Sequence, residues 1–283
     1  MNGLRNLGNT CYMNAGLQML LNNKKLCKTI YESETNNEFI ATFKMFIKSY
    51  HSNNNKILIP KFIKKFIEKI NSEFIGFKQN DSSEFLTILL ENINKLIYSQ
   101  NESNNIIDNI FKIQIKNTIK CKMRDCLYKR NNNEESIKLL LNIENNFSNL
   151  DDCYRLFKKS EKLDCDNMVD CESCNRKTVV SRKVDILNWP NDLIIVLKRF
   201  NYNKSGRIFK NNKNIKVSLD WRKGYKLQGI IYHSGNATGG HYVYIGKHNN
   251  NWYLYDDDSV SQINSCKQLD QYLNYGYVYY FTK

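Results

Sequence analysis

A cysteine lies at position 11, where a polar stretch gives way to apolar residues at helical spacing, from Tyr12 to Leu21. A helix that begins at Cys11 would stabilise the thiolate, because unpaired N–H groups and the positive end of the helix dipole lie there. Gly8 would let a substrate backbone come close to the sulfur. The side-chain amide of Asn6 could face an oxyanion beside the backbone N–H of Cys11. The pattern suits either a nucleophilic thiol or a buried structural cysteine that begins a core helix.

A thiol nucleophile requires a base, which the fold can bring from a distant part of the chain. Of the four histidines, His51 precedes an asparagine run and His248 lies in a polar turn, so both are expected to be solvated. His233 and His241 flank a segment of small and polar residues, 234–240. Two glycines directly before His241 would leave this segment mobile and let a substrate backbone pass. His233 and His241 are therefore the candidate bases.

Acidic residues occur in two places that bear on such a site. Asp256, Asp257 and Asp258 follow an aromatic run, and an acid near the base could orient its imidazole ring. An acidic triplet is also typical of a solvated turn at a strand end. Farther upstream, Asp81 and Glu84 open a helical pattern as a capping-box-like pair, in which the Asp81 side chain accepts backbone N–H bonds.

Two pairs of cysteines lie in the middle of the chain. Cys171 and Cys174 form a Cys-x-x-Cys with turn-forming neighbours, which is typical of a zinc knuckle. Cys121 and Cys126 are separated by a longer spacer, and Cys165 is an alternative ligand. Four thiolates around one zinc ion would make a closed structural site with no open position for chemistry. The cysteines outside any motif are interpreted as ordinary thiols: Cys27, Cys153 and Cys266.

The composition limits the class of protein. The chain has 283 residues, of which 41% are hydrophobic, enough for one large domain or two small lobes. Its net charge of +14 raises the question of nucleic acid or an anionic membrane as a partner. The lysines are dispersed, however, and an AT-rich genome explains the over-use of Asn, Lys and Ile, so the composition argues against nucleic-acid binding.

The cysteine count and the first residues indicate a compartment. Nine cysteines is an odd number, and the chain opens without an apolar signal region. No apolar run approaches the ~20 residues that span a membrane. We therefore expect a reducing intracellular location, cytoplasmic or nuclear, or the same compartments of a host cell if the protein is viral.

Helical periodicity dominates the first part of the chain, and strand patterns dominate the rest. Helices are expected at 12–21, 39–50, 61–70 and 85–96. Strands are expected at 111–119, 137–143 and 179–187, and then at 193–200, 226–233, 241–245, 252–255 and 276–281. The polar segment 201–214 is expected to be an exposed loop. Helices first and strands later favour an α+β fold, with a cysteine-bearing insertion between two lobes.

Five motifs occur in order along the chain. They are GLRNLGNTCYMN at 3–14, QNDSSEF at 79–85, LKRF at 197–200, GGHY at 239–242 and WYLYDD at 252–257. Together they resemble the cysteine box, the Gln-x-Asp-x-x-Glu-Phe segment, the Leu-Lys-Arg-Phe strand, the Gly-His-Tyr box and the terminal Asp pattern of the ubiquitin-specific proteases. These are papain-like cysteine deubiquitinases.

The resemblance implies roles for individual residues. The catalytic set would be Cys11 as nucleophile, His241 as general base, Asp256 as the residue that orients the imidazole, Asp257 as an adjacent polar assistant, and Asn6 at the oxyanion. The tail-binding set would be Gln79, Asp81 and Glu84, which hold the basic C-terminal tail of ubiquitin, and His233, a loop residue beside the catalytic groove. Leu197–Phe200 would belong to the scaffold.

The resemblance also implies an architecture and a reaction. A single catalytic domain, 1–283, would comprise a helical thumb (1–110), a mainly fingers insertion (111–190) and a mainly palm, β-rich part (191–283). Structural zinc would bind Cys121, Cys126, Cys171 and Cys174, with no catalytic cofactor. A monomer would hydrolyse the isopeptide or peptide bond after the C-terminal glycine of ubiquitin in ubiquitinated proteins. The alternatives are a ubiquitin-like modifier as substrate, a non-catalytic ubiquitin-binding pseudoenzyme, and a zinc-dependent nucleic-acid binder.

Overall fold

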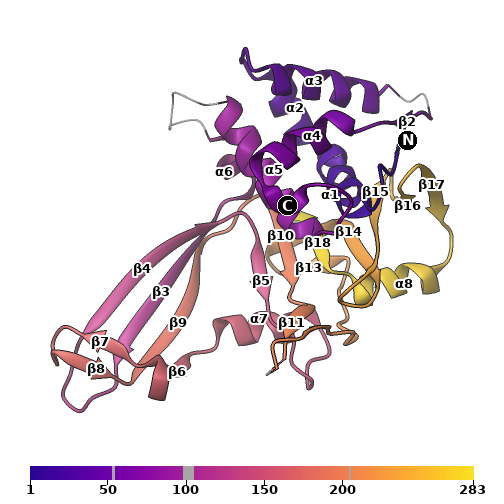
Figure 1. Ribbon diagram of the computed structural model, residues 1–283. Helices are drawn as coiled ribbons and strands as arrows, with labels where there is room; N and C mark the ends of the chain where they lie inside the picture. Colours follow the sequence, from indigo (N-terminus) through magenta and orange to yellow (C-terminus); the bar gives the residue numbers. More distant parts are fainter. Residues whose placement is uncertain (53–54, 98–104, 204) are drawn as a thin grey trace.

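The computed structural model describes residues 1–52, 55–97, 105–203 and 205–283. Helices gather in the N-terminal part, a long arm of strands follows, and the C-terminal part forms a sheet (Figure 1). The α+β class and the order of helices before strands are confirmed. Residues 98–104, which fall inside the expected helical part, lie outside the described residues.

The helical lobe is built from described residues within 3–52, 55–97 and 105–111. Its helices are α1 (Cys11–Asn22), α2 (Lys24–Glu32), α3 (Glu38–Tyr50), α4 (Lys61–Ile70), α5 (Ser82–Ile97) and α6 (Ile106–Phe111), joined by η1 (Ser72–Phe74) and the parallel pair β1 (Gly3–Leu4) and β2 (Ile57–Leu58). Asparagine side chains at Asn23, Asn37 and Asn105 cap α2, α3 and α6. The predicted helix 61–70 is confirmed, whereas α2 and α6 were not predicted. Within the described residues, no helix combines the length and apolar character that crossing a membrane requires.

Helix α1 is the centre of this lobe. Every residue from Cys11 to Leu21 is buried, because α5 packs on one side and the sheet packs on the other. A side chain at Gly16 would meet the Phe85 ring at 2.9 Å, so α1 and α5 approach closely there. A helix buried all round has no freedom to shift by itself. The first residue of α1, Cys11, is therefore held between the helical lobe and the sheet.

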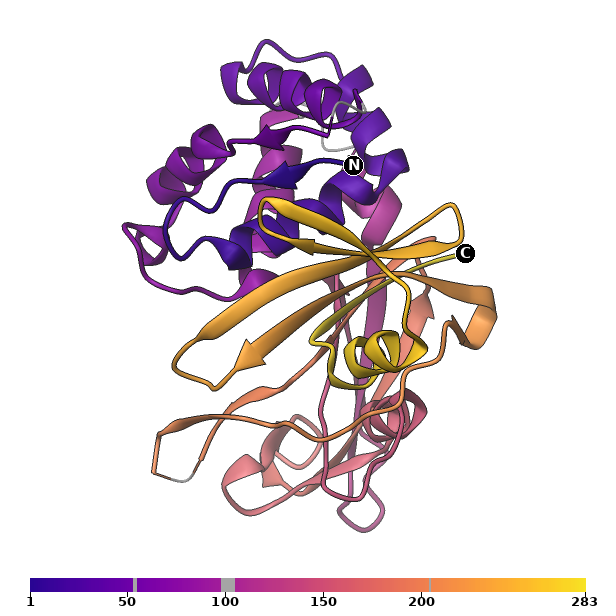
Figure 2. The ribbon, with the colours of Figure 1, turned by 90° about the vertical axis from the view of Figure 1, so that its right-hand side faces the viewer.

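The C-terminal sheet has the strand order β17-β16-β15-β14-β18-β10-β5, with β13 paired to β14. Its strands are β5 (Leu139–Leu141), β10 (Asp192–Leu197), β13 (Asp220–Trp221), β14 (Tyr225–Gly235), β15 (Gly240–His248), β16 (Asn251–Asp256), β17 (Ser259–Ile263) and β18 (Val278–Thr282). The helical lobe covers one face, and α7 (Leu150–Lys158) and α8 (Cys266–Tyr275) cover the other (Figure 2). Strand β10 is buried throughout because both faces are covered.

The arm is a separate sheet of order β4-β3-β9-β6 with a hairpin near its tip (Figure 1). It comprises β3 (Ile113–Cys121), β4 (Lys129–Ser136), β6 (Glu161–Leu163), β9 (Val180–Asn188) and the hairpin β7 (Val169–Cys171) and β8 (Arg176–Thr178), with η3 (Cys165–Asn167) before it. Strand β4 is exposed almost throughout and was not predicted, because its polar sequence shows no hydrophobic alternation. The arm therefore has little core of its own.

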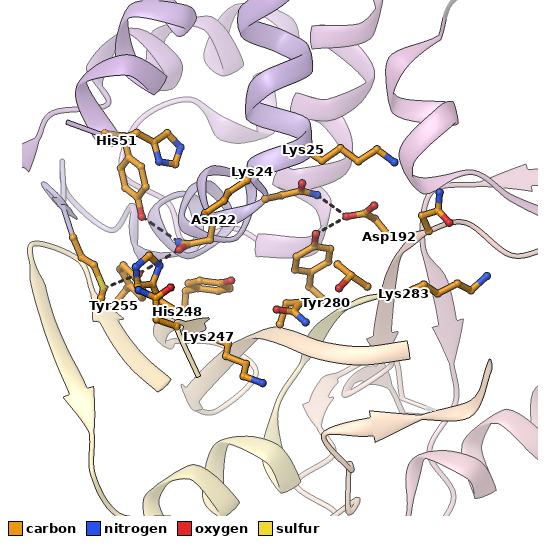
Figure 3. A pocket seen from close by; sticks show the side chains of 18 residues that line it. Asn22, Lys24, Lys25, His51, Asp192, Lys247, His248, Tyr255, Tyr280 and Lys283 are labelled. Carbon is orange, nitrogen blue, oxygen red and sulfur yellow. Dashed lines mark hydrogen bonds between the residues drawn. The ribbon is translucent and has the colours of Figure 1, made fainter. Parts of the chain in front are cut away.

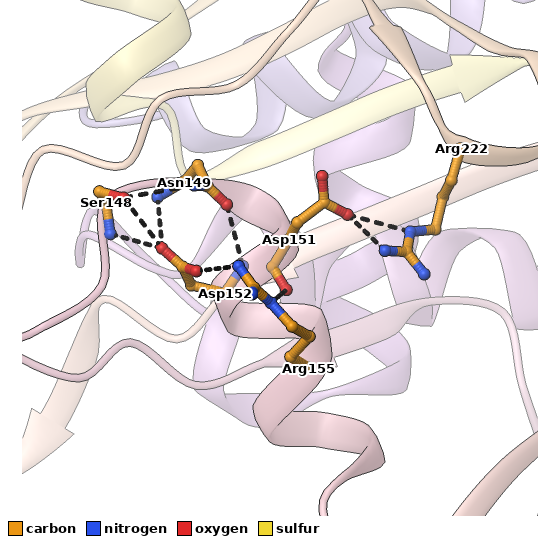
Figure 4. A network of polar contacts seen from close by, with 6 residues as sticks. All are labelled: Ser148, Asn149, Asp151, Asp152, Arg155 and Arg222. Atoms are coloured by element: carbon orange, nitrogen blue, oxygen red, sulfur yellow. Dashed lines mark hydrogen bonds and ion pairs between the residues drawn. The ribbon is translucent and has the colours of Figure 1, made fainter.

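Polar contacts fix the start of α7 (Figure 4). Asn149 accepts the N–H of Asp152 at 3.0 Å, and the Asp152 carboxylate accepts the N–H of Asn149 at 3.1 Å, which completes a capping box. Asp151 accepts a 3.0 Å hydrogen bond from Arg222 Nε, at the start of η4 (Arg222–Gly224). The Arg222 guanidinium also lies 4.1 Å from the centre of the Tyr154 ring. These contacts join α7 to the chain segment that leads into β14.

Arg199 is a buried cation in the scaffold, with 1% of its surface exposed. Its guanidinium donates to backbone carbonyls of Gly276 at 2.7 Å, Lys213 at 2.8 Å, Asn211 at 3.1 Å and Asn274 at 3.1 Å. The predicted loop 201–214 contains part of a short hairpin, β11 (Phe200–Tyr202) and β12 (Ile208–Lys210), which corrects that expectation. Residue 204 lies outside the described residues.

Candidate active site

The backbone before Cys11 is folded around the side chain of Asn6. Asn6 Oδ1 accepts the N–H of Gly8 at 2.9 Å and the N–H of Thr10 at 3.2 Å. Gly8 has φ +98°, a left-handed conformation that favours glycine, and a Cβ there would meet the Phe77 ring at 2.6 Å. This turn delivers Cys11 as the first residue of α1, with 4% of its surface exposed. The backbone N–H of Cys11 has no acceptor within the part of the chain that the structure describes.

The amide nitrogen of Asn6 is directed at Asp257. Asn6 Nδ2 donates to Asp257 Oδ2 at 2.8 Å, which differs from the expectation of an amide aimed only at an oxyanion beside Cys11. The physical reason is that the turn after β16 brings a carboxylate close to the turn before α1. Among the described residues, the second N–H of this amide has no acceptor.

His241 and Asp256 come from neighbouring antiparallel strands. His241 lies at the start of β15 and Asp256 at the end of β16, so both reach the same end of the sheet. His241 Nε2 lies 2.6 Å from Asp256 Oδ1. Because Nε2 is engaged by the carboxylate, Nδ1 is the ring nitrogen left for Cys11. The structure thus makes Asp256, rather than Asp257, the hydrogen-bond partner of the imidazole.

The electrostatic environment favours the imidazolium form of His241. Its pKa is raised to about 9, first by the nearby Cys11 side chain and then by Asp256, against an opposing effect of burial. An imidazolium beside a thiolate is the ion pair that activates a cysteine nucleophile. The structure therefore brings the Cys11 thiol, the His241 imidazole and the Asp256 carboxylate into one site.

Asp257 occupies the junction of three segments and has φ 50°. Its Oδ1 accepts from Asn14 Nδ2 at 2.7 Å, and its backbone carbonyl accepts the N–H of Leu4 at 2.7 Å. With Asn6 on the other carboxylate oxygen, Asp257 links β1, α1 and the turn after β16. The sequence reasoning missed Asn14. Its position inside the cysteine box was a usable signal, but in an asparagine-rich chain it carried little weight.

Gln79 bridges the helical lobe and the segment before His241. Gln79 Nε2 donates to the carbonyl of Gly240 at 3.1 Å, and Gln79 Oε1 accepts the N–H of Gly240 at 3.0 Å. The predicted substrate-binding residue is therefore within reach of the base, through a pair of hydrogen bonds between residues 161 positions apart.

Asp81 has the cap position that the sequence predicts for α5. Its Oδ1 accepts the N–H of Glu84 at 2.9 Å, while Oδ2 accepts from Tyr277 at 2.7 Å and from Tyr242 at 3.4 Å. The second hydrogen bond of a capping box, in which the Asp81 N–H would donate to the Glu84 carboxylate, is absent among the described residues. Much of the Glu84 side chain is exposed, but partial desolvation of its carboxyl, together with the charges of Glu73 and Asp81, raises its pKa. The hydroxyls of Tyr242 and Tyr277 were also missed by the sequence reasoning.

His233 corrects a prediction. The resemblance assigned it to a loop, whereas the hydrophobic pattern ended a strand at it; it lies within β14, which continues to Gly235, with 5% of its surface exposed. Its ring packs against those of Phe200 and Tyr242, with centroid distances of 5.3 and 4.4 Å. Burial, Lys210 and His241 lower its pKa to about 4, so it is neutral near pH 7.

The four cysteines predicted as metal ligands meet at the tip of the arm. Their sulfur atoms all lie within 4.8 Å of one another, and Cys126 Sγ is 3.7 Å from Cys171 Sγ. Four thiolates at the usual Zn–S distance of ~2.3 Å would place sulfurs about 3.8 Å apart, so these residues fit a zinc ion. Two backbone turns hold these cysteines in place: the Cys174 N–H donates to the Cys171 carbonyl, and the Cys126 N–H donates to the Met123 carbonyl. Cys165 lies outside this cluster.

The sequence profile described as ubiquitin carboxyl-terminal hydrolase matches residues 2–281. Ubiquitin carboxyl-terminal hydrolase 25 of Arabidopsis thaliana is 30% identical over 92% of this chain and 44% of the relative. Ubiquitin carboxyl-terminal hydrolase 21 of Homo sapiens is 25% identical over 99% of this chain and 61% of the relative. The chain thus spans about half the length of the curated relatives it matches.

Solved structures share the fold. A SAGA DUB module of Ubp8, Sgf11, Sus1 and Sgf73 bound to monoubiquitin matches with a TM-score of 0.82 and 22% identity, covering 100% of this chain and 69% of that chain. The Ubp8/Sgf11/Sus1/Sgf73 module bound to ubiquitin aldehyde matches with a TM-score of 0.80 and the same coverage. Because the family profile spans almost the whole sequence, the chain belongs to the ubiquitin carboxyl-terminal hydrolase family.

Proposed function

We propose that this protein is a thiol-dependent deubiquitinase that hydrolyses the isopeptide or peptide bond after the C-terminal glycine of ubiquitin. The observation that carries the proposal is the convergence of Cys11, His241 and Asp256, from α1, β15 and β16, at one end of the sheet. Family membership supports the reaction, and the two solved structures of similar fold are complexes with ubiquitin or its aldehyde.

The first half of the reaction is acylation of Cys11. The thiolate attacks the carbonyl carbon of the terminal glycine and forms a tetrahedral oxyanion. The backbone N–H of Cys11 and the second N–H of Asn6 stabilise that oxyanion, since both lack acceptors among the described residues. The C–N bond then breaks, His241 gives its proton to the leaving amine, and a thioester between Cys11 and ubiquitin remains.

The second half is hydrolysis of the thioester. Neutral His241 takes a proton from a water molecule, the hydroxide attacks the thioester carbonyl, and the thiolate of Cys11 leaves. Asp256 keeps the imidazole in one orientation through both halves. The released products are ubiquitin with a free carboxylate and the substrate amine.

The ubiquitin tail is basic and is proposed to reach Cys11 between the helical lobe and the sheet. Glu84 offers an exposed carboxylate along this route. Asp81 contributes mainly by capping α5 and by holding Tyr242 and Tyr277. The pair of hydrogen bonds between Gln79 and Gly240 spans the same route, so it must open or move aside when the tail binds.

Structural zinc is the second part of the proposal. Cys121, Cys126, Cys171 and Cys174 would hold the ion as a closed four-thiolate site. The ion would tie the loop after β3 to the hairpin β7–β8 and take no part in the reaction, because the cluster lies at the far tip of the arm (Figure 1).

A ubiquitin with an electrophile at its C-terminus tests the activity directly. We expect the purified, reduced protein to form a covalent adduct, seen as a mass increase equal to the probe, and Cys11→Ala to form none. Cys27→Ala, which removes another buried thiol, is the matched control and should react like the wild type.

Parallel incubations with probes made from ubiquitin-like modifiers define the substrate. A wild-type protein that is folded and reduced but forms no adduct with the ubiquitin probe contradicts the proposal. An adduct with only a ubiquitin-like probe assigns the same chemistry to that modifier.

A further inference from the structure

A cavity of about 590 Å³ lies between the helical lobe and the sheet, away from Cys11 (Figure 3). The helical lobe contributes the end of α1, the start of α2 and the end of α3, and the sheet contributes parts of β14, β15, β16 and β18. Cys11 begins α1, whereas Asn22, which lines the cavity, ends it. His241 lies near the start of β15, whereas Lys247 and His248 lie at its end. The two elements that carry the thiol and the base thus both have their far ends at this cavity.

The charged groups around the cavity are mostly cationic. Lys24 and Lys25 lie on the helical side and Lys247 on the sheet side (Figure 3). Within the described residues, none of these three ammonium groups lies within ion-pair distance of a carboxylate. His51 and His248 add two further titratable bases.

The counter-charge at the cavity is already engaged. Asp192 is the acidic side chain among the described lining residues, and it is buried. Its Oδ1 accepts hydrogen bonds from Asn23 Nδ2 at 3.0 Å and from Tyr280 at 2.5 Å. Lys283 also borders the cavity, but its ammonium lies 4.9 Å from the centre of the Tyr225 ring, outside the lining residues. The charge of Lys25 also acts on Asp192, but among the described residues none of the three lysines forms an ion pair.

The start of α2 adds unpaired backbone donors on the helical side of the cavity. Asn23 caps α2 by accepting the N–H of Leu26, and the N–H groups of Lys24 and Lys25 have no acceptor among the described residues. Donors of this kind suit a ligand with acceptor oxygens.

The positive potential has a local signature at His51. Its pKa is lowered, first by burial and then by the charge of Lys24. His51, the residue that follows α3, therefore lies within the electrostatic influence of a cation on α2.

We propose that this cavity binds a small molecule that carries a polyphosphate and an aromatic ring, of the size of a nucleoside triphosphate. The volume lies within the ~300–1,000 Å³ of small-molecule sites. Three unpaired ammonium groups and a helix start match several negative charges better than a single carboxylate. The rings of Tyr50, Tyr255 and Tyr280 supply an aromatic wall for the uncharged part. This site is independent of the proposed deubiquitinase activity.

The ligand would join the two lobes. It would contact α2 on one side and β15 on the other, and a ligand that binds only the folded state raises the stability of that state. The expected consequence is a melting temperature that rises with ligand concentration.

Calorimetric titration at ~0.15 M salt, where exposed charges are screened, tests the proposal with two probes, ATP and inorganic tripolyphosphate. The variant Lys24→Gln/Lys247→Gln removes two cations at the cavity. The control Lys61→Gln/Lys65→Gln removes two exposed lysines from α4, which line none of the cavity and form no ion pair in the described residues. Both variants lose the same charge, so non-specific attraction to the basic chain falls equally in each.

We expect saturable binding of ATP with a stoichiometry of one, weaker binding of tripolyphosphate, and a loss of about tenfold or more in affinity for the cavity variant alone. No saturable binding by the wild type overturns the proposal, and so does an equal loss in both variants. Equal affinity for ATP and tripolyphosphate overturns the aromatic part and leaves a polyphosphate site. The melting temperatures of the unliganded variants are expected to match that of the wild type. This control separates a loss of binding from a loss of folding.

Discussion

The Asn6 side chain donates a 2.8 Å hydrogen bond to Asp257, although 251 positions separate the two residues in the chain. This contact joins the turn before Cys11 to the turn after Asp256. Asn14 of α1 donates to the other oxygen of the same carboxylate. Asp257 therefore helps to set the position of Cys11 relative to Asp256, the carboxylate that holds His241. Its own carboxylate is hydrogen-bonded to Asn6 and Asn14.

Asp257→Ala is expected to lower kcat on a ubiquitin C-terminal amide by about 100-fold, the usual effect of losing one oxyanion donor. The reason is that Asn6 loses the acceptor that orients its amide. KM should change little, because the ubiquitin-binding surface is untouched. Asp258→Ala is the matched control, since Asp258 is partly exposed and its ion pair with Arg5 has an N···O distance of 3.9 Å. Equal effects of the two substitutions would show that Asp257 has no special positioning role.

The pH dependence follows from the pKa of His241, which is raised to about 9. The thiolate–imidazolium pair is lost as the imidazole deprotonates, so kcat/KM should fall through a basic limb near pH 9. Stability has the same sign: the contribution of the charged histidine is present below its unfolded pKa of about 6.5 and is lost as pH rises through about 9. In Cys11→Ala the main cause of the shift is gone, so the imidazole pKa measured by NMR should decrease. An unchanged value would contradict this origin.

The sequence predicted the elements that have a strong hydrophobic period. The helix 61–70 agrees with α4, and α1 begins at Cys11, one residue before the predicted start. The polar elements α2 and β4 escaped prediction because packing and pairing, rather than their own pattern, stabilise them. The pattern also ended one strand two residues early: the predicted strand 226–233 corresponds to β14, which continues to Gly235.

The candidate site was predictable as a set of residues but not as a set of contacts. Motifs name Cys11, His241 and Asp256, and the antiparallel pairing of β15 with β16 explains why the latter two meet. No local pattern shows that Asn6 donates to Asp257. That contact depends on β1 lying beside the turn after β16, where Leu4 N–H bonds to Asp257 O at 2.7 Å. The spacing of residues along the chain does not predict which distant segments pack against each other.

Arg199→Met is expected to lower the free energy of unfolding by about 3–5 kcal/mol. The substitution leaves backbone carbonyls in a buried region without their donor, at distances that now range from 2.7 Å for Gly276 to 3.1 Å for Asn274. Urea denaturation measures the change. Lys198→Met removes the neighbouring exposed cation and should alter stability little. A small effect at Arg199 would mean that water can replace the guanidinium.

Cys171→Ser is expected to abolish bound zinc and to lower the melting temperature by several degrees, because the tip of the arm has little core to replace the ion. Alkylation of Cys11 by a small electrophile should be unchanged. Cys165→Ser is the control, since Cys165 is exposed and lies outside the cluster. Metal analysis and thermal unfolding provide the readouts, and full zinc content in Cys171→Ser would exclude this residue as a ligand.

Gly240, directly before His241, has no room for a side chain. A Cβ would lie 2.0 Å from the Ser234 carbonyl oxygen and 2.4 Å from His233 Nε2. The carbonyl belongs to the paired strand and the imidazole is buried, so neither yields easily. Gly240→Ala must therefore shift the start of β15, and with it the base.

We expect Gly240→Ala to reduce kcat/KM by about 100-fold, because a displacement near 1 Å at a catalytic group has effects of that order, and to cost about 1–3 kcal/mol of stability through overpacking. Gly239→Ala is a closely matched control: a Cβ there meets only Gln79 Oε1, at 3.6 Å, which is ordinary contact. Steady-state kinetics and urea denaturation of both variants separate the two effects. If Gly240→Ala retained full activity while Gly239→Ala lost it, the placement of His241 by its close packing against His233 would be wrong.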